Sequence, residues 1–181
     1  MEHEISNIDL EAVASDAQLA PVHDYWHSIR RARLMPLLTD MDMMALPLKV
    51  VPWCSICDVT SGARDFSIRF WGTERVGMHG IDYTGRSVSE FRLPVVRDKM
   101  LTAYAAVVET SKPVLFKISL ATDLDTEIQR THYKMLYLPF GQDDTVSAIL
   151  SVPSFADNRK LVYDWFEAEV PIAVLTSQTP V

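Results

Sequence analysis

The sequence predicts an α+β fold in which helices cover one face of a five-stranded antiparallel sheet. Five segments between residues 53 and 152 alternate apolar and polar side chains with the period of two that strands require. Apolar residues recur at a helical spacing in residues 97–110 and again near the N-terminus. Short connections join most of the strands, which favours antiparallel pairing. Antiparallel strands with segregated helices define the α+β class.

The composition is that of one globular domain with terminal extensions. The chain has 181 residues, 48% of them hydrophobic, so a core needs no disulfide or metal support. Its formal net charge is −7, which argues against general nucleic-acid binding because such binding requires a cationic face. Residues 1–24 hold six acids and no Lys or Arg, so we expect residues 1–18 to form an acidic, mobile N-terminus.

No targeting or membrane signal is present in the sequence. No segment approaches the 18 or so consecutive apolar residues of a transmembrane helix, and the N-terminus lacks the basic and apolar regions of a signal peptide. Two cysteines cannot form a disulfide framework. We therefore expect a cytoplasmic protein that does not contact the membrane.

An N-terminal helix and a connector occupy residues 19–52. Ser15 or Asp16 can cap a helix that ends before Pro36. One stripe of this helix is apolar and includes Tyr25, Trp26 and Ile29. We expect these three residues to pair two subunits, which predicts a homodimer. Residues 37–52 are rich in Met and Pro and predict an irregular connector.

Residues 53–152 form the predicted core of the domain. Trp53–Thr60 and Asp65–Trp71 predict a hairpin with its loop at residues 61–64. In the second strand of this hairpin, parity places Phe66, Ile68 and Phe70 on one face and Arg69 and Trp71 on the other. The helix at Arg97–Thr110 carries Tyr104 on its apolar face, and strands follow at Pro113–Leu120, Thr126–Leu138 and Val146–Val152. Residues 153–181 are a C-terminal extension with a short closing helix at 158–167.

Residues 20–152 resemble a bacterial subfamily of small, mostly single-domain PAS proteins. The helix and connector carry the subfamily's Tyr-Trp pair, Arg, Leu, Pro and Asp, here Tyr25, Trp26, Arg30, Leu34, Pro36 and Asp40. The second strand supplies Arg69, Phe70, Gly72 and Thr73, and an Asp-x-Thr-Gly-Arg turn follows at Asp82, Thr84, Gly85 and Arg86. Leu138-Pro139-Phe140 matches the Leu-Pro signature at the end of the fourth strand. The sequence departs from the subfamily at Met43 and Met44, where a Pro is common.

The resemblance implies a non-catalytic sensory or protein-docking module of bacterial signal transduction. PAS sheets and helices enclose a pocket that holds haem, flavin, a metabolite or nothing, and signals pass to a partner protein. With no output domain after residue 152, the module is expected to act in trans on a signalling protein. Strand and helix parity suggests a ligand pocket near Arg69, Trp71, Tyr104 and His132. No cofactor follows from the sequence, and neither haem nor flavin is supported by it.

Two enzymatic alternatives stay open, although no catalytic motif is present. An isomerase-like or dehydratase-like cavity would need a buried acid and His, for which Asp58 and His132 are the candidates. A thiol oxidoreductase would use Cys54 and Cys57 in Trp-Cys-x-x-Cys. Strand residues three apart face opposite ways, which argues against that pair meeting. No metal-ligand spacing is present.

Overall fold

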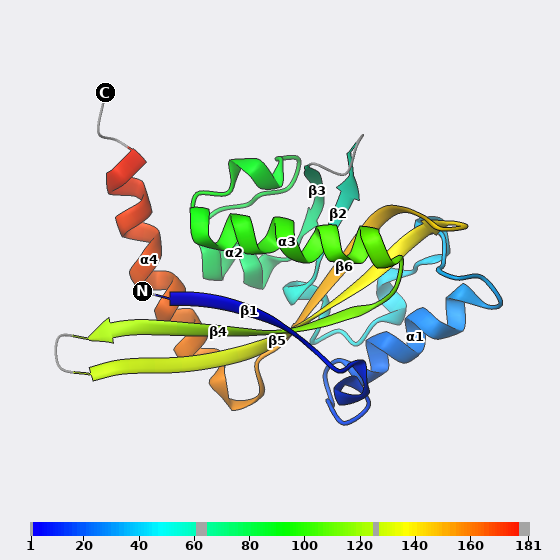
Figure 1. Cartoon of the computed structure of the whole chain (residues 1–181), viewed down its shortest axis with the longest axis horizontal. Helices are drawn as coiled ribbons and strands as arrows, with labels where there is room; N and C mark the ends of the chain where they lie inside the picture. The colour runs from blue at the N-terminus through cyan, green and yellow to red at the C-terminus, as the bar shows by residue number, and fades with distance from the viewer. Residues whose placement is uncertain (1, 61–64, 125–126, 178–181) are drawn as a thin grey trace.

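The computed structural model describes residues 2–60, 65–124 and 127–177, so the predicted loop at 61–64 lies outside it. A six-stranded antiparallel sheet has the strand order β1-β4-β5-β6-β2-β3 (Figure 1). The strands are β1 Glu2–Ile8, β2 Ser55–Val59, β3 Phe66–Trp71, β4 Val114–Leu124, β5 Glu127–Gln142 and β6 Thr145–Ser154. The predicted α+β class and PAS-like element order are confirmed, while the sheet has one strand more than expected.

The additional strand is β1, which comes from the segment that we expected to be an acidic, mobile tail. It pairs with the outer edge of β4, and Ile5 lies opposite Ile118. The segment shows no clear period of two, because its inward positions mix apolar and polar residues. Its pairing uses backbone groups that β4 would otherwise leave unpaired at the sheet edge. Because backbone hydrogen bonds hold this strand, its side chains need not alternate between apolar and polar.

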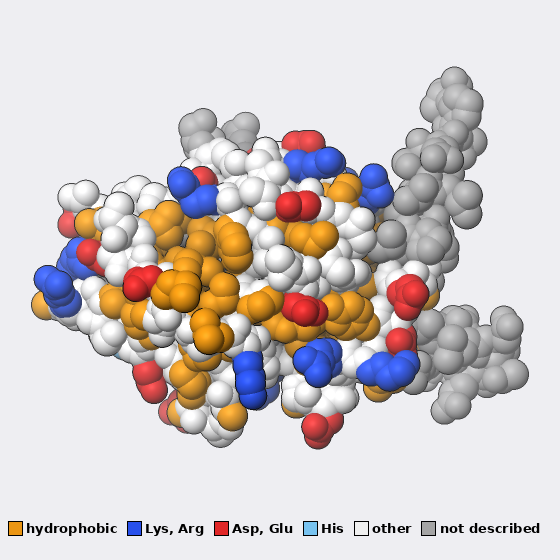
Figure 2. Space-filling view, turned by 180° about the vertical axis from the view of Figure 1, so that it is seen from behind, with side chains coloured by type: hydrophobic (Ala, Val, Ile, Leu, Met, Phe, Trp, Pro, Cys, Tyr) orange, Lys and Arg blue, Asp and Glu red, His pale blue; other side chains and the backbone are white. Residues whose placement is uncertain are grey.

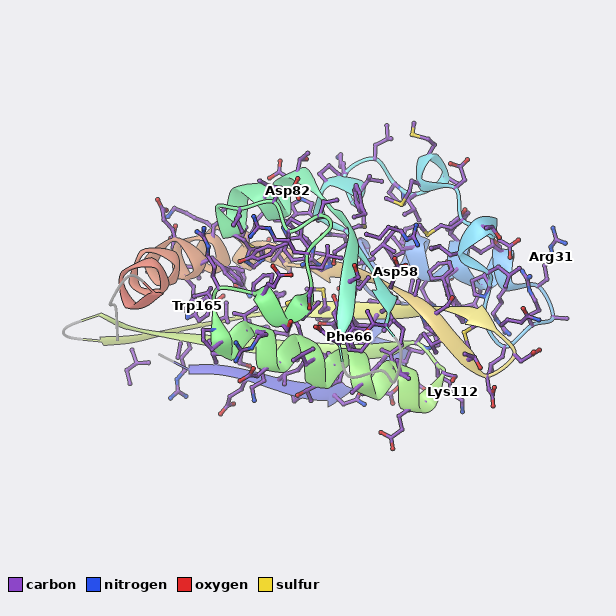
Figure 3. All side chains as sticks on the ribbon, turned by 90° about the horizontal axis from the view of Figure 1, so that it is seen from above. Arg31, Asp58, Phe66, Asp82, Lys112 and Trp165 are labelled. Carbon is purple, nitrogen blue, oxygen red and sulfur yellow. The ribbon has the colours of Figure 1, made fainter. Side chains whose placement is uncertain are left out.

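Three helices pack on one face of the sheet, which we call the inner face. They are α2 Thr73–His79, α3 Pro94–Thr110 and α4 Arg159–Ser177. Figure 1 shows α3 above the sheet and running roughly along β1 and β4, with α4 beside the left-hand ends of β4 and β5. In the view from above, Phe66 of β3 lies next to α3 (Figure 3), where its ring contacts that of Tyr104 at 4.9 Å between centroids. Side chains of the inner face and of these helices pack together as part of the hydrophobic core.

The N-terminal helix α1 (Ala20–Arg30) and the connector pack on the opposite, outer face. The buried indole of Trp26 donates a hydrogen bond to the carbonyl of Pro139 on β5, 2.8 Å away. Asp16 fixes the start of this segment, since its carboxylate accepts hydrogen bonds from Ser154 Oγ (2.9 Å) and Lys134 Nζ (3.2 Å). The predicted helix cap at Asp16 is not present, because α1 begins after Leu19 without a side-chain cap; the Asp16 carboxylate instead accepts from the backbone N–H groups of Gln18 and Leu19 in the turn before the helix.

A β-bulge at Arg69 changes which side chains of β3 face inward. The register runs from Cys57 opposite Ile68 to Ile56 opposite Phe70, so Arg69 has no partner on β2. The extra residue reverses the alternation beyond it. Trp71 therefore lies in the core, on the same inner face as Ile68, and Phe70 is only half-buried. This corrects the predicted parity, which placed Trp71 on the face of Arg69.

Gly72 fixes where α2 begins. A Cβ at this position would lie 2.1 Å from the carbonyl oxygen of Pro52, so only glycine permits this approach of the two backbones. The N–H of Gly72 donates to the carbonyl of Cys54 at 2.9 Å. Helix α2 then ends at Gly80, which adopts the left-handed conformation common after a helix. These two glycines set the position of every side chain on α2.

Candidate functional site

A small cavity lies between the inner face of the sheet and all three inner helices. Its volume is about 20 Å³, which suffices for about one water molecule. The lining combines methionines, aromatic residues and a few polar groups. It comprises Ile5, Arg75, Met78, His79, Val96, Lys99, Met100, Tyr104, Ile118, Tyr133, Met135, Tyr137, Ser151 and Phe166.

Arg75 of α2 is the central polar group of this cavity. It is 4% exposed, and its guanidinium lies over the indole of Trp71 at 4.9 Å from the ring centroid. Nε donates to the carbonyl of Trp53 at 2.5 Å, and Nη2 contacts the sulfur of Met135 at 3.4 Å. Among the described residues no carboxylate forms an ion pair with it. A buried charge without a counter-charge costs free energy, so this arrangement needs a reason.

The cavity lining is electropositive. It contains Arg75 and the half-buried Lys99, and no Asp or Glu. Burial raises the pKa of Tyr133 to about 12, against an opposing effect of the Arg75 charge. Burial also raises the pKa of Tyr137. Both phenols are therefore neutral hydrogen-bond donors at physiological pH.

His79 is the second buried titratable group of α2. Burial, reinforced by the positive charge of Arg75, holds its pKa well below the usual value. The ring is thus a neutral imidazole, and its Nδ1 has no hydrogen-bond partner in the described part of the chain. It contacts Phe166 of α4 at 4.5 Å between centroids. The cavity therefore reaches α4 through His79 and Phe166.

Of the four predicted pocket residues, two lie at the cavity and two lie away from it. Tyr104 lines the cavity, where its hydroxyl accepts hydrogen bonds from Cys57 Sγ (3.2 Å) and Ser151 Oγ (3.3 Å). Trp71 lies directly behind Arg75. Arg69 points to solvent on the face opposite Ile68, as its parity predicted, and pairs with Asp58 at 2.9 Å. His132 is exposed and lies outside the cavity, beside a separate shallow groove.

The predicted interface stripe packs within its own chain. Trp26 is 2% exposed, and Ile29 is half-buried against the core. The hydroxyl of Tyr25 accepts a hydrogen bond from the backbone N–H of Asp42 at 2.7 Å. These side chains hold the connector against the outer face of the sheet; Trp26 is enclosed there, whereas Tyr25 and Ile29 stay partly exposed, and their role between subunits stays a prediction. The homodimer itself stays a prediction.

Neither enzymatic alternative gains support from the geometry. In the strand register Asp58 lies opposite Ala148, which lies opposite Phe140. His132 is eight residues (140 minus 132) from Phe140 along β5, about 26 Å at the usual rise per residue. The two cannot form an acid–base pair across that distance.

The cysteines are likewise unsuited to redox chemistry. Both are buried and free, and burial raises the pKa of each thiol to about 12. The reactive form of a cysteine is the thiolate, which is scarce at neutral pH for such groups. Cys54 donates to the carbonyl of Val50, whereas Cys57 donates to Tyr104, so the two thiols have different partners.

Arg75 is the main residue that the sequence reasoning missed. Arg75, Met78 and His79 share one face of α2, because they are spaced three and four residues apart. The sequence does contain a signal for Arg75, namely a cation on the apolar face of a short helix. This signal can be used only if residues 73–79 are first predicted to be helical.

No group of three or more His, Cys, Asp or Glu side chains in the described ranges is placed to hold a metal ion. In the same ranges, no helix has the length and apolar character to span a membrane.

Comparisons with known proteins bear on the family of this chain. No curated protein matches it. A solved structure of an RNA-binding light-oxygen-voltage receptor aligns with a TM-score of 0.42 and 8% identity, covering 99% of this chain and 45% of the receptor chain. The present chain thus spans less than half the length of that receptor. The model of a PAS domain family matches residues 14–152. The chain therefore belongs to this PAS domain family.

Proposed function

We propose that this PAS domain is a non-catalytic bacterial sensor that binds a small molecule in the inner cavity. PAS domains are typically sensory or signalling modules, usually without catalytic activity. The observation that carries the proposal is that the sheet, α2, α3 and α4 all contribute to one buried, electropositive cavity. A ligand there would touch every element of the inner layer at once.

Helix α4 is the element through which occupancy would be transmitted. Phe166 forms part of the cavity wall and packs against His79. The helix is otherwise held to α2 by the hydroxyl of Tyr163, which donates to the Glu74 carboxylate at 3.0 Å. The indole of Trp165 donates to the carbonyl of Ala121 on β4 at 3.2 Å. A ligand that displaces Phe166 competes with these contacts and changes how α4 is docked.

Such a switch requires a ligand with different affinities for the two positions of α4. A signalling protein that contacts α4 in one position would read the state of the cavity. Action in trans on such a partner is part of the proposal.

Native mass spectrometry of freshly purified protein, together with hydrogen exchange of α4, tests this function. We expect a co-purifying small molecule, whose removal decreases hydrogen exchange in α4 because the docking contacts of this helix are then restored. Phe166→Ala should weaken the effect of the ligand on α4, whereas Lys160→Ala, on the exposed side of the same helix, should leave it unchanged. An empty cavity that accepts no compound, or a bound molecule without effect on α4, would contradict the sensor.

A second candidate is a docking module that works through its outer surface. Met44 is 76% and Leu48 71% exposed, and a groove of about 420 Å³ lies beside the same connector. Figure 2 shows hydrophobic side chains gathered on this back face. Lys49 and Arg159 line the groove and no acid does, which favours an acidic partner segment with apolar residues. Binding of such a peptide by the wild-type protein, together with loss of this binding in Leu48→Ser, would favour the docking function.

A further inference from the structure

We propose that the inner cavity binds a small monocarboxylate, whose carboxyl group pairs with Arg75. This rests on the proposed function, because it takes the cavity as the sensory site and specifies the chemical class of its ligand. The inference comes from three features of the cavity: its unpaired charge, its neutral donors and its size.

The first feature is the unused hydrogen-bonding capacity of Arg75. A guanidinium has five N–H donors. One is used by Trp53 and one by the weak acceptor Met135, which leaves three without a partner in the described part of the chain. The planar fork of Arg matches the two oxygens of a carboxylate. An entering carboxylate would therefore supply both the missing charge and the missing acceptors.

The second feature is the set of hydroxyl groups around the charge. Tyr104, Tyr133 and Tyr137 line the same cavity from α3 and β5. Ser151 lies opposite Tyr137 in the strand register and donates its one hydroxyl proton to Tyr104, so Tyr104 keeps its own proton for another acceptor. Neutral hydroxyls can donate to carboxylate oxygens without repelling them. The lining contains no acid that would oppose an anion.

The third feature is size, which limits the ligand. The space of about 20 Å³ holds roughly one water molecule, far less than the several hundred Å³ of a typical ligand pocket. A carboxyl group can displace that water, while a short hydrocarbon tail must displace side chains. Met78, Met100 and Met135 line the cavity and are flexible enough to repack around such a tail. Bulky anions and cofactors do not fit this space.

Titration of the protein with formate, acetate, propionate and butyrate tests the proposal. Binding is followed by calorimetry and by the indole N–H signal of Trp71, which lies against the guanidinium. We expect saturable binding that strengthens from formate to a longer member of the series. Arg75→Met should weaken binding at least about thirtyfold, because it removes the buried partner of a charge. Arg75→Lys should restore part of the affinity, since it keeps the charge but not the fork.

Matched controls separate this role from general effects. Arg69→Met removes an exposed arginine of β3, the strand that precedes α2, and should leave the affinity for propionate unchanged. Met100→Phe fills space in the cavity without touching the charge, so it should weaken butyrate more than formate. This variant keeps the proposal testable if Arg75→Met does not fold. Propionamide, chloride and phosphate are the ligand controls, and none should match propionate.

Equal binding by wild type and Arg75→Met would overturn the proposal. So would propionamide, chloride or phosphate binding as tightly as the carboxylates. A neutral co-purifying molecule in native mass spectrometry would overturn the monocarboxylate and leave the sensory function intact. An empty cavity that takes up none of these compounds would overturn both.

Discussion

The guanidinium of Arg75 stacks on the indole of Trp71 at 4.9 Å from the ring centroid, inside the core and without an acidic partner among the described residues. A desolvated cation–π contact contributes about 2 kcal/mol. Transfer of a charge from water to the protein interior costs several kcal/mol. The stack and the bond to Trp53 therefore offset only part of the cost. The folded protein holds a cationic site that an anion would stabilise.

The position of α2, and with it Arg75, depends on Gly72. Gly72→Ala places a Cβ 2.1 Å from the carbonyl oxygen of Pro52, so backbone must move. We expect a loss of more than about 2 kcal/mol in the free energy of unfolding, by the magnitude of steric strain in packed sites. Gly77→Ala is the matched control, because its Cβ has ordinary contact with Tyr163 Oη at 3.5 Å. It should stabilise α2 by up to about 1 kcal/mol, since Ala is the better helix former. Urea unfolding measures both, and equal effects would contradict this role of Gly72.

Trp26 should act as a structural anchor of α1 and not as a contact between subunits. Trp26→Phe removes the donor that satisfies the buried carbonyl of Pro139, which should cost about 1–3 kcal/mol. Tyr25→Phe removes a half-buried hydroxyl and should cost less. Thermal unfolding and analytical ultracentrifugation measure stability and oligomeric state together. A change of oligomeric state in Trp26→Phe without loss of stability would support the interface predicted from the sequence.

Asp16 should make stability depend on pH in the acidic range. Its side chain is 9% exposed. Burial opposes ionisation, but hydrogen bonds from Ser154, Leu19, Lys134 and Gln18 leave the net pKa lowered. A carboxyl whose pKa is lower in the folded state stabilises above its unfolded pKa of about 3.9, and this contribution disappears as pH falls through the folded pKa.

Asp16→Asn should therefore cost about 2 kcal/mol at pH 7, the typical magnitude for hydrogen bonds to a charged group. The difference from wild type should shrink below about pH 4. Asp40→Asn, which removes an exposed partner of Arg33, should have the smaller effect at pH 7. A difference for Asp16→Asn that is constant from pH 7 to pH 3 would rule out the assigned role of its charge.

Both cysteines should be unreactive in the folded protein. With pKa values of about 12, roughly 10⁻⁴ of each thiol is ionised at pH 8. A disulfide-exchange reagent should therefore label Cys54 and Cys57 only at the rate of unfolding, and Cys57→Ser should leave the labelling rate of Cys54 low. Rapid labelling of the native protein, or a reversible Cys54–Cys57 disulfide, would revive the oxidoreductase alternative.

Regular alternation made much of the fold predictable from the sequence, and interruptions of it account for the errors. The helix over 97–110 and the strands around 113–152 follow clear periods and are confirmed. The bulge at Arg69 adds one residue that no period can reveal, and it reverses the face of Trp71. Strand β1 pairs through its backbone at a sheet edge, so its side chains carry little signal.

The candidate site was less predictable than the fold. Tyr104 could be placed because its helix is long and amphipathic. Arg69 was predicted at the pocket but stays on the exposed face of β3, because the bulge brings only Trp71 to the inner face, whereas a short helix turns Arg75 inward. The positions of these two arginines depend on tertiary contacts, such as the close approach of Gly72 to Pro52. A local sequence pattern does not reveal contacts between residues so far apart in the chain.

The free energy of unfolding of wild type and Arg75→Met, each with and without saturating propionate, tests the central claim most directly. Without propionate, we expect Arg75→Met to be as stable as wild type or more stable, because it removes a buried unpaired charge and keeps a similar volume. With propionate at a hundredfold excess over the wild-type Kd, wild type should gain about 2.7 kcal/mol, and Arg75→Met should gain less than about 1 kcal/mol. A wild type that is more stable by the same amount in both conditions would show that Arg75 serves the core alone, and would contradict the anion site.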